Sequence, residues 1–427
     1  MWRPALAPSV VVLRKDDVWC FLRPELPDWL VGNRNVAAIL SRCDGQASAH
    51  SIAAALAAEH GALTPQAILN FLRDTRANHA LFADQRPPVP PARVHALRAV
   101  HLSLTEACNL HCVYCYATDR LPPKDGLTLE EYTALFAELA LLGRPLEIVL
   151  TGGEPTLHPH WLAIARRAKE LGHTPQLLTN GTRLTPEAMA QCAELFGLIK
   201  VSIDGSRAEI HDAHRGAGSF QAAMTAVEAL LAHNAPVELS MTVTQQNIRD
   251  IPAAAERFGS LLHFAPLFKA GRAVHRPELD ISGEEYYAAL TSARGVNPLS
   301  SLCSVMATAR QSPIRKCALG DAEMSIAPDG QAYPCHLLHF PEFGAGNIRH
   351  TPLADILAAP AMRHCRNLTV ETLAGCRECT VRLLCGGACR ARVFHATGDI
   401  AGKDPFCVYE ERAYLEGLFA AHTLVDI

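Results

Sequence analysis

Fifteen cysteines, most of them crowded into two short parts of the chain, constrain the fold more than any other feature of the sequence. One group lies in residues 108–115, and the other places eight cysteines within residues 317–407. Between Cys115 and Cys303 there is one cysteine, Cys192. Clustered thiols in a chain with no secretory signal more often bind metal than form disulfides. The sequence therefore predicts two metal-binding regions on one scaffold.

Charge and hydropathy argue against two classes of partner. The 39 basic and 43 acidic residues give a net charge of −4, without the basic excess that phosphate backbones attract, so we expect no nucleic-acid partner. The sequence has no run of about 18 uncharged apolar residues, so we expect no membrane span. The first residues, MWRPALAPSVVVLRKDD, are broken by prolines and lead to no cleavage site. We therefore expect a cytoplasmic protein.

Residues 1–86 are expected to form a first unit. VVVLRKDDVWCFL (residues 10–22) has the pattern of a hairpin that turns at Asp16–Asp17, and three short helical patterns follow it. Thr64 and Pro65 open the last of these helices as N-cap and first helical residue. A hairpin and three small helices suggest a winged-helix-like module. Residues 87–95 are rich in proline and predict a linker, which would make the module separable.

Residues 96–300 alternate strand and helix patterns. Thr128 and Glu131 form a capping box at the start of the first helix. Such alternation predicts a parallel sheet covered by helices, which for six strands is a partial (β/α)6 TIM barrel in an α/β fold. Active sites of such folds lie at the carboxyl ends of the strands. The six candidate strands are residues 100–104, 146–151, 175–179, 199–203, 237–243 and 262–268.

Residues 301–427 lose this alternation and become rich in cysteine and in loops. This composition is expected where metal clusters take the place of a hydrophobic core. We therefore predict a separate, cysteine-rich C-terminal domain.

The first candidate strand runs into TEACNLHCVYC, in which Cys108, Cys112 and Cys115 have the spacing CxxxCxxC. Three thiolates on a short loop can hold three irons of a cubane cluster. The fourth iron then stays open for a chelating ligand such as the amino and carboxylate groups of S-adenosylmethionine (AdoMet). A zinc loop is the alternative, although zinc knuckles usually recruit a histidine or a second CxxC pair. His111 lies inside the loop, and we interpret it as a filler.

This loop, with Tyr114 before its last cysteine, resembles the radical AdoMet (radical SAM) superfamily, and the resemblance covers residues 97–270. TGGEP, TNG, VSIDG and HDAHRG follow in the family's order. The resemblance implies that Cys108, Cys112 and Cys115 hold a [4Fe–4S] cluster that reductively cleaves AdoMet. It also implies cofactor-binding roles for Tyr114, Gly152, Gly153, Glu154, Pro155, Ser202, Asp204 and Arg215.

The C-terminal cysteines follow the patterns C-x12-G-x4-C and C-x2-C-x5-C-x3-C, with a further cysteine at the end of CGGACRARVFHATGDIAGKDPFC. This order resembles the SPASM extension of peptide-modifying radical enzymes. The resemblance implies two auxiliary [4Fe–4S] clusters, and therefore three clusters in all. The implied ligands are Cys317, Cys335 and Cys389 for the first auxiliary cluster, and Cys376, Cys379, Cys385 and Cys407 for the second.

Seven thiolates leave the first auxiliary site one ligand short. Cys303 is the nearest upstream candidate. The alternatives are that Cys303 is a free core cysteine, or that an open iron binds a thiolate of the substrate. Cys365 lies in a helical pattern, and we interpret it as structural. The apolar surroundings of Cys20, Cys43 and Cys192 predict core positions.

The first 86 residues resemble the peptide-recognition element of ribosomal-peptide pathways, a relative of the small chaperone of pyrroloquinoline quinone synthesis. The likeness lies in VWCFLRPE, WLVGNRNVAAIL and DGQASAHSIAAALAAEHG. It implies that a precursor's leader binds as an added strand on the small sheet. The alternative is a generic winged helix that contacts DNA, which the lack of a basic recognition helix disfavours.

Together these patterns predict a maturase of ribosomally made peptides. We expect a 5′-deoxyadenosyl radical to abstract a hydrogen from the precursor, after which a thioether or carbon–carbon crosslink closes. The expected partners are the precursor peptide and an electron donor such as flavodoxin or ferredoxin. One alternative is a maturase of a folded protein or redox-cofactor precursor, of the sulfatase-activating or pyrroloquinoline quinone type. Another is a non-catalytic peptide-binding scaffold.

Overall fold

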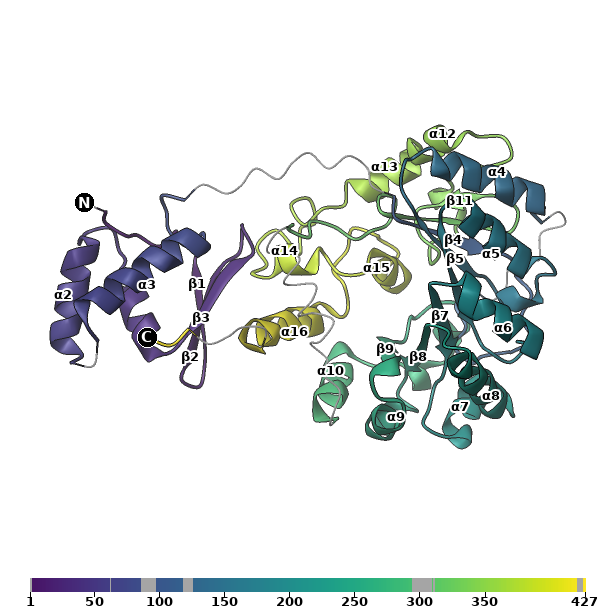
Figure 1. Ribbon diagram of the computed structural model, residues 1–427, viewed down its shortest axis with the longest axis horizontal. Helices are drawn as coiled ribbons and strands as arrows, with labels where there is room; N and C mark the ends of the chain where they lie inside the picture. Colours follow the sequence, from purple (N-terminus) through teal and green to yellow (C-terminus); the bar gives the residue numbers. More distant parts are fainter. Residues whose placement is uncertain are drawn as a thin grey trace.

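The computed structural model describes residues 2–61, 63–85, 97–117, 126–293, 309, 312–420 and 425–427. Figure 1 shows an N-terminal unit at one end of the molecule and a large sheet with its helices at the other. Three helices of the cysteine-rich region lie between them, namely α14 (Arg382–Cys385), α15 (Arg390–Thr397) and α16 (Cys407–Ala420). In the part of the chain that is described, no helix is both long and apolar enough to cross a membrane.

The N-terminal unit consists of a three-stranded antiparallel sheet followed by three helices. The predicted hairpin is confirmed, because β1 (Val11–Lys15) and β2 (Val18–Arg23) pair across a turn at Asp16, whose φ is 52°. A third strand, β3 (Asp28–Gly32), pairs with β2 and was not predicted. The helices are α1 (Arg34–Ser41), α2 (Ala49–Glu59) and α3 (Pro65–Asn78).

Both faces of this small sheet are buried. On one face, Phe21 and Leu30 pack with α1, α2 and α3. On the other face, Trp29 packs in a cluster that includes Tyr414 and Leu418 of α16. The N-terminal unit therefore shares a hydrophobic core with the cysteine-rich region. The separable module stays a prediction, and its removal would expose this face of α16.

The large sheet contains all six predicted strands, in parallel and in chain order. β10 (Glu323–Ile326) extends it, pairing parallel with β4, and β11 (Ala332–Tyr333) pairs antiparallel with β10. These two strands were missed because they lie in the cysteine-rich segment. The sheet thus crosses the predicted domain limit at residue 300. The six predicted strands are β4 (Ala99–Ser103), β5 (Glu147–Thr151), β6 (Thr174–Thr179), β7 (Leu198–Ser202), β8 (Val237–Val243) and β9 (Leu262–Pro266).

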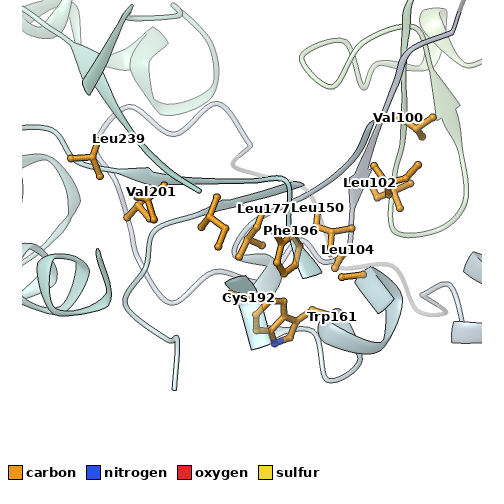
Figure 2. Close-up of a cluster of buried hydrophobic side chains, with 14 of the residues drawn as sticks. Val100, Leu102, Leu104, Leu150, Trp161, Leu177, Cys192, Phe196, Val201 and Leu239 are labelled. Carbon is orange, nitrogen blue, oxygen red and sulfur yellow. The ribbon is translucent and has the colours of Figure 1, made fainter. Parts of the chain in front are cut away.

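Helices cover the outer face of the sheet. The predicted capping box of Thr128 and Glu131 is present at the start of α4. Figure 2 shows buried side chains of the strands beside Trp161 of α5 and Phe196, the residue after α6, whose rings stack at 6.0 Å. Cys192 is fully buried beside them, as predicted. The helices are α4 (Leu129–Ala140), α5 (Trp161–Glu170), α6 (Pro186–Leu195), α7 (Ala208–Arg215), α8 (Ser219–Ala232), α9 (Ile251–Phe258) and α10 (Gly283–Ser292).

Among the described residues of the cysteine-rich region, α12 (Leu353–Leu357) and α13 (Pro360–Arg366) are further short helices. Cys365 of α13 is fully buried in a hydrophobic cluster, as predicted for a structural cysteine. Cys20 and Cys43 are likewise buried in the cores of the N-terminal unit. Cys303 lies outside the described residues.

Candidate functional site

The loop that carries Cys108, Cys112 and Cys115 leaves the carboxyl end of β4 and is held in place by its neighbours. The Asn109 side chain donates to Thr182 at 2.8 Å and accepts from Asn180, beyond the end of β6. Arg272 donates its guanidinium to the Cys112 carbonyl and its backbone N–H to the Cys115 carbonyl. Residues that follow β6 and β9 therefore hold the loop in place.

The three thiols of this loop lie close enough to influence one another electrostatically. Burial raises the pKa of Cys112 to about 11, and the charges of Cys108 and Cys115 add to the rise while Arg215 opposes it. Burial also raises the pKa of Cys108, on which Cys115 acts in the same direction. Thiols that raise one another's pKa become thiolates readily only when a cation joins them. The loop is therefore suited to a metal centre.

The glycines of TGGEP allow the end of β5 to pack closely against the cysteine loop. A Cβ on Gly152 would lie 2.4 Å from the Thr105 carbonyl oxygen, and one on Gly153 would lie 2.3 Å from that of Ala107. The Gly153 N–H donates to Thr105 at 2.7 Å. We expected these glycines to let backbone approach the cofactor. In the structure, their lack of side chains is required by the cysteine loop itself.

Glu154 is buried and joins the ends of two strands. One carboxylate oxygen accepts from Thr156 and from the Thr179 hydroxyl, and the other accepts from the Asn180 N–H at 2.8 Å. Pro155 starts the short 3₁₀ helix that follows, Pro155–Leu157. Glu154 thereby ties β5 to β6 just beneath the cysteine loop.

Asp204 and Arg215 form a buried ion pair next to Cys112. Arg215 donates to the Asp204 carboxylate and, at 2.6 Å, to the hydroxyl of Tyr114, which itself donates to Asp204. The third guanidinium nitrogen lies 3.9 Å from the Cys112 sulfur. The pKa of Asp204 is below its usual value, because Arg215 outweighs the opposing effect of burial. Ser202 is the last residue of β7, two positions before Asp204.

The cysteines of the C-terminal region gather into two sets. In the first, burial raises the pKa of Cys335, and the charges of Cys317 and Cys389 raise it further. The second set lines one cavity, and its members are Cys376, Cys379, Cys385 and Cys407. Among the described residues, no three Cys, His, Asp or Glu side chains come close enough together to hold a single ion. Both C-terminal sets and the cysteine loop at β4 are thus spread more widely than the ligands of one ion.

The CGGAC segment turns through left-handed backbone between the two sets. The φ angles are 69° at Gly386, 86° at Gly387 and 57° at Ala388. Burial raises the pKa of Cys385, but the N–H groups of Ala388 and Gly387 donate to its sulfur and partly offset this rise. Gly386 and Gly387 adopt this conformation without strain, whereas Ala388 is a non-glycine residue held in it.

Arg390 is a buried cation between the two sets that sequence reasoning missed. The residue is 1% exposed, and its guanidinium donates to the carbonyls of Gly387 and Gly402. Its Nε atom has no hydrogen-bond partner. Its charge lowers the pKa of both Cys317 and Cys376, against the larger effect of burial. The signal available in the sequence was an arginine directly after Cys389.

Two family profiles match the chain. The radical SAM superfamily profile matches residues 102–258, and that of the SPASM iron–sulfur cluster-binding domain matches residues 317–380. The AdoMet-dependent heme synthase of Methanosarcina barkeri is 31% identical over 350 residues, with 74% of this chain and 98% of that protein covered.

The chain belongs to the radical SAM superfamily. It is an enzyme of that superfamily and carries a SPASM domain. A second relative is the mycofactocin maturase MftC of Mycobacterium ulcerans, which is 29% identical, with 71% of this chain and 86% of that protein covered. The predicted membership of the radical SAM superfamily, with a SPASM domain, is therefore confirmed.

A solved structure extends the likeness in fold to the first residues. SuiB of Streptococcus suis, bound to its precursor peptide SuiA, has a TM-score of 0.58 and 12% identity to this chain. The match covers 95% of this chain and 99% of SuiB. The unmatched 5% is far shorter than the N-terminal unit, so the likeness includes most of that unit.

Radical SAM enzymes require AdoMet and iron–sulfur clusters, and the residues present fit these groups. The loop at β4 offers three thiols beside a buried arginine, and the two C-terminal sets flank the orphaned Nε of Arg390. A buried cation stabilises an anionic cluster with thiolate ligands. The fold brings the loop cysteines together with Gly152, Gly153, Glu154, Asp204 and Arg215 at neighbouring strand ends. Their individual roles towards the cofactors stay predictions.

Proposed function

We propose that this radical SAM enzyme is a maturase of ribosomally made peptides. The observation that carries the proposal is the position of the small N-terminal sheet on the cysteine-rich region. β3 packs through Trp29 on α16, and α16 begins at Cys407 of the second C-terminal set. If the leader of a precursor bound as an added strand on that sheet, the core segment, which is the part to be modified, would begin beside the cysteine-rich region. The likeness in fold to SuiB supports the same reading.

Within this proposal, the chain's own residues hold three cysteine sites in fixed geometry. When bound, the cluster at Cys108, Cys112 and Cys115 and its AdoMet supply hydrogen abstraction from an unactivated carbon. Arg215 and Asp204 keep a fixed charge beside Cys112. Glu154 holds the ends of β5 and β6 together. The C-terminal sets are proposed to hold two auxiliary clusters, giving three in all. When bound, these clusters would supply an acceptor for the electron that is released as a thioether or carbon–carbon bond closes.

The test uses short precursor peptides encoded beside the gene. Reduced enzyme and AdoMet are incubated with each peptide, and the products are analysed by mass spectrometry. The proposal predicts a product that has lost a pair of hydrogens and carries an internal crosslink. This product is expected from the intact precursor and not from the core segment without its leader. Cofactor cleavage without any change in such peptides would contradict it.

A tetrapyrrole-modifying function is the second candidate. It is favoured by the identity of 31% to a heme synthase, against 29% to a mycofactocin maturase. The same assay with an iron porphyrin in place of peptide distinguishes the two functions. Formation of heme, detected by its absorption and mass, would favour the second candidate and remove the need for a leader-binding sheet.

A further inference from the structure

Three residues near the end of the sequence lie along the outer edge of β3. Val425 forms a parallel bridge with Gly32, donates its N–H to the Val31 carbonyl at 3.0 Å, and accepts from the Asn33 N–H at 3.3 Å. Figure 1 shows this end of the chain beside β3, far from the large sheet. The edge of β3 is therefore paired with a segment that follows α16.

Side chains reinforce this pairing. Val425 and Ile427 both pack against the core of the N-terminal unit. The Asn33 side chain donates to the Asp426 carboxylate, and the Asn35 side chain donates to the Ile427 carbonyl at 2.6 Å. The edge of β3 thus accepts an extended segment with an aliphatic, an acidic and an aliphatic residue in succession.

Strand addition requires an edge whose backbone groups are available. β2 pairs on both sides, so the sheet offers its β1 edge and its β3 edge. At the β3 edge, the Val31 carbonyl and the Asn33 N–H are the groups that a guest strand would use, in either direction. Both are already bonded to Val425. A guest strand cannot pair with these two groups while Val425 remains in place.

We propose that residues 425–427 are a displaceable internal strand that fills the β3 edge and competes with any guest peptide that adds there. The inference rests on the proposed function only for the identity of that guest, the leader of a precursor. Residues 425–427 are held by two backbone hydrogen bonds, by the side chains of Asn33 and Asn35, and by two half-buried aliphatic side chains. The guest expected from this edge is an extended peptide with the same aliphatic–acidic–aliphatic order.

The strength of the competition follows from the covalent connection. Four residues separate Ala420, the last residue of α16, from Val425. A segment on so short a connection acts at an effective concentration of about 1 mM. If its own dissociation constant is about 0.1 mM, a guest binds about tenfold more weakly to the full chain than to a chain without the segment.

The first arm of the test needs no precursor. A fluorescent heptapeptide of residues 421–427 (AHTLVDI) is titrated into the full chain and into a chain that ends at Ala420. We expect it to bind the shortened chain about tenfold more tightly, and a heptapeptide with Asp426→Lys to bind less well. Amide hydrogen exchange at Asn33 is expected to be faster in the shortened chain and to slow again when the heptapeptide is added.

A full-length variant controls for effects of the deletion other than the loss of pairing at β3. Val425→Pro removes the N–H that bonds Val31, and it should behave like the shortened chain. Asp426→Asn keeps an oxygen that accepts from Asn33 and serves as the matched control. Equal binding of the heptapeptide to the full and shortened chains, or unchanged exchange at Asn33, would overturn the inference, as would guest pairing at β1.

The second arm uses the leader of an encoded precursor with the same proteins. Tighter binding of the leader to the shortened chain and to Val425→Pro supports both the internal strand and the proposed function. Where the heptapeptide distinguishes the two chains but no leader binds either, the internal strand is supported and the peptide-maturase function fails. The experiment therefore distinguishes failure of the internal-strand inference from failure of the proposed function.

Discussion

At the scale of single residues, the pair of Asp204 and Arg215 is the most consequential contact beneath the cysteine loop. Replacing Arg215 by Gln leaves the fully buried Asp204 carboxylate without its cation. Removing one partner of a buried ion pair typically costs about 3–5 kcal/mol in the free energy of unfolding. Urea denaturation at pH 7 should show a loss of this size, and the double variant Asp204→Asn/Arg215→Gln should recover part of it.

The same variant predicts a pH dependence of stability. In the parent, the lowered pKa of Asp204 contributes stability that is complete above its unfolded value, about pH 4, and is lost as the pH falls through its folded value. Without Arg215, burial raises the pKa of Asp204. The deficit of the variant is therefore largest at neutral pH and narrows towards pH 4. A deficit that is constant between pH 4 and pH 7 would contradict this account.

Gly153 tests whether the close contact with the cysteine loop matters. In Gly153→Ala, the new Cβ overlaps the Ala107 carbonyl, so the loop must shift, at about 1–3 kcal/mol. Reconstituted protein should bind less iron at this loop and cleave less AdoMet. Gly61→Ala is the matched control, since nothing lies within 4 Å of its Cβ. Full iron binding by Gly153→Ala would show that the loop does not depend on this contact.

Sequence reasoning predicted most of these residues, but not their contacts. The motif order indicated Asp204, Arg215 and Tyr114 as cofactor-binding residues, whereas the structure joins them to one another and to Cys112. Arg390 was missed because arginines next to cysteines are common on surfaces. Only the fold shows that this one is buried between two sets of thiols.

At the scale of elements, α16 connects the N-terminal sheet to the second C-terminal cysteine set. Leu418→Ala deletes a fully buried side chain in their shared cluster and should cost about 2–5 kcal/mol. Hydrogen exchange should rise both in β3 and around Cys385, because both border the same cluster. Val408→Ala on the same helix, 69% exposed, is the control and should have an effect within about 0.5 kcal/mol. A rise confined to β3 would argue against the shared core.

Elements with a clear period were predictable, and doubly buried ones were not. The six parallel strands and the capped helices follow from their patterns, and the structure contains them. β3 was missed because all five of its residues are buried, which removes the alternation that marks a strand. β10 was missed because its partner, β4, lies over 200 residues earlier in the chain.

At the scale of the whole molecule, three cysteine sets sit on a scaffold whose parts share cores. The N-terminal sheet packs on the cysteine-rich region, and that region contributes β10 to the large sheet. No local pattern predicts such sharing, since it depends on contacts distant in sequence. Shared cores couple the order of one site to that of the others, so substitutions are better tests of function here than deletions.

The central claim is that the loop at β4 holds the cluster that cleaves AdoMet, apart from the C-terminal sets. The measurement is iron content and 5′-deoxyadenosine formation by reduced protein in which Cys108, Cys112 and Cys115 are all replaced by Ala. We predict the loss of about four irons and of all cofactor cleavage, with the remaining iron retained. Cys192→Ala, which alters a core cysteine, should change neither readout. Formation of 5′-deoxyadenosine by the triple variant would contradict the account.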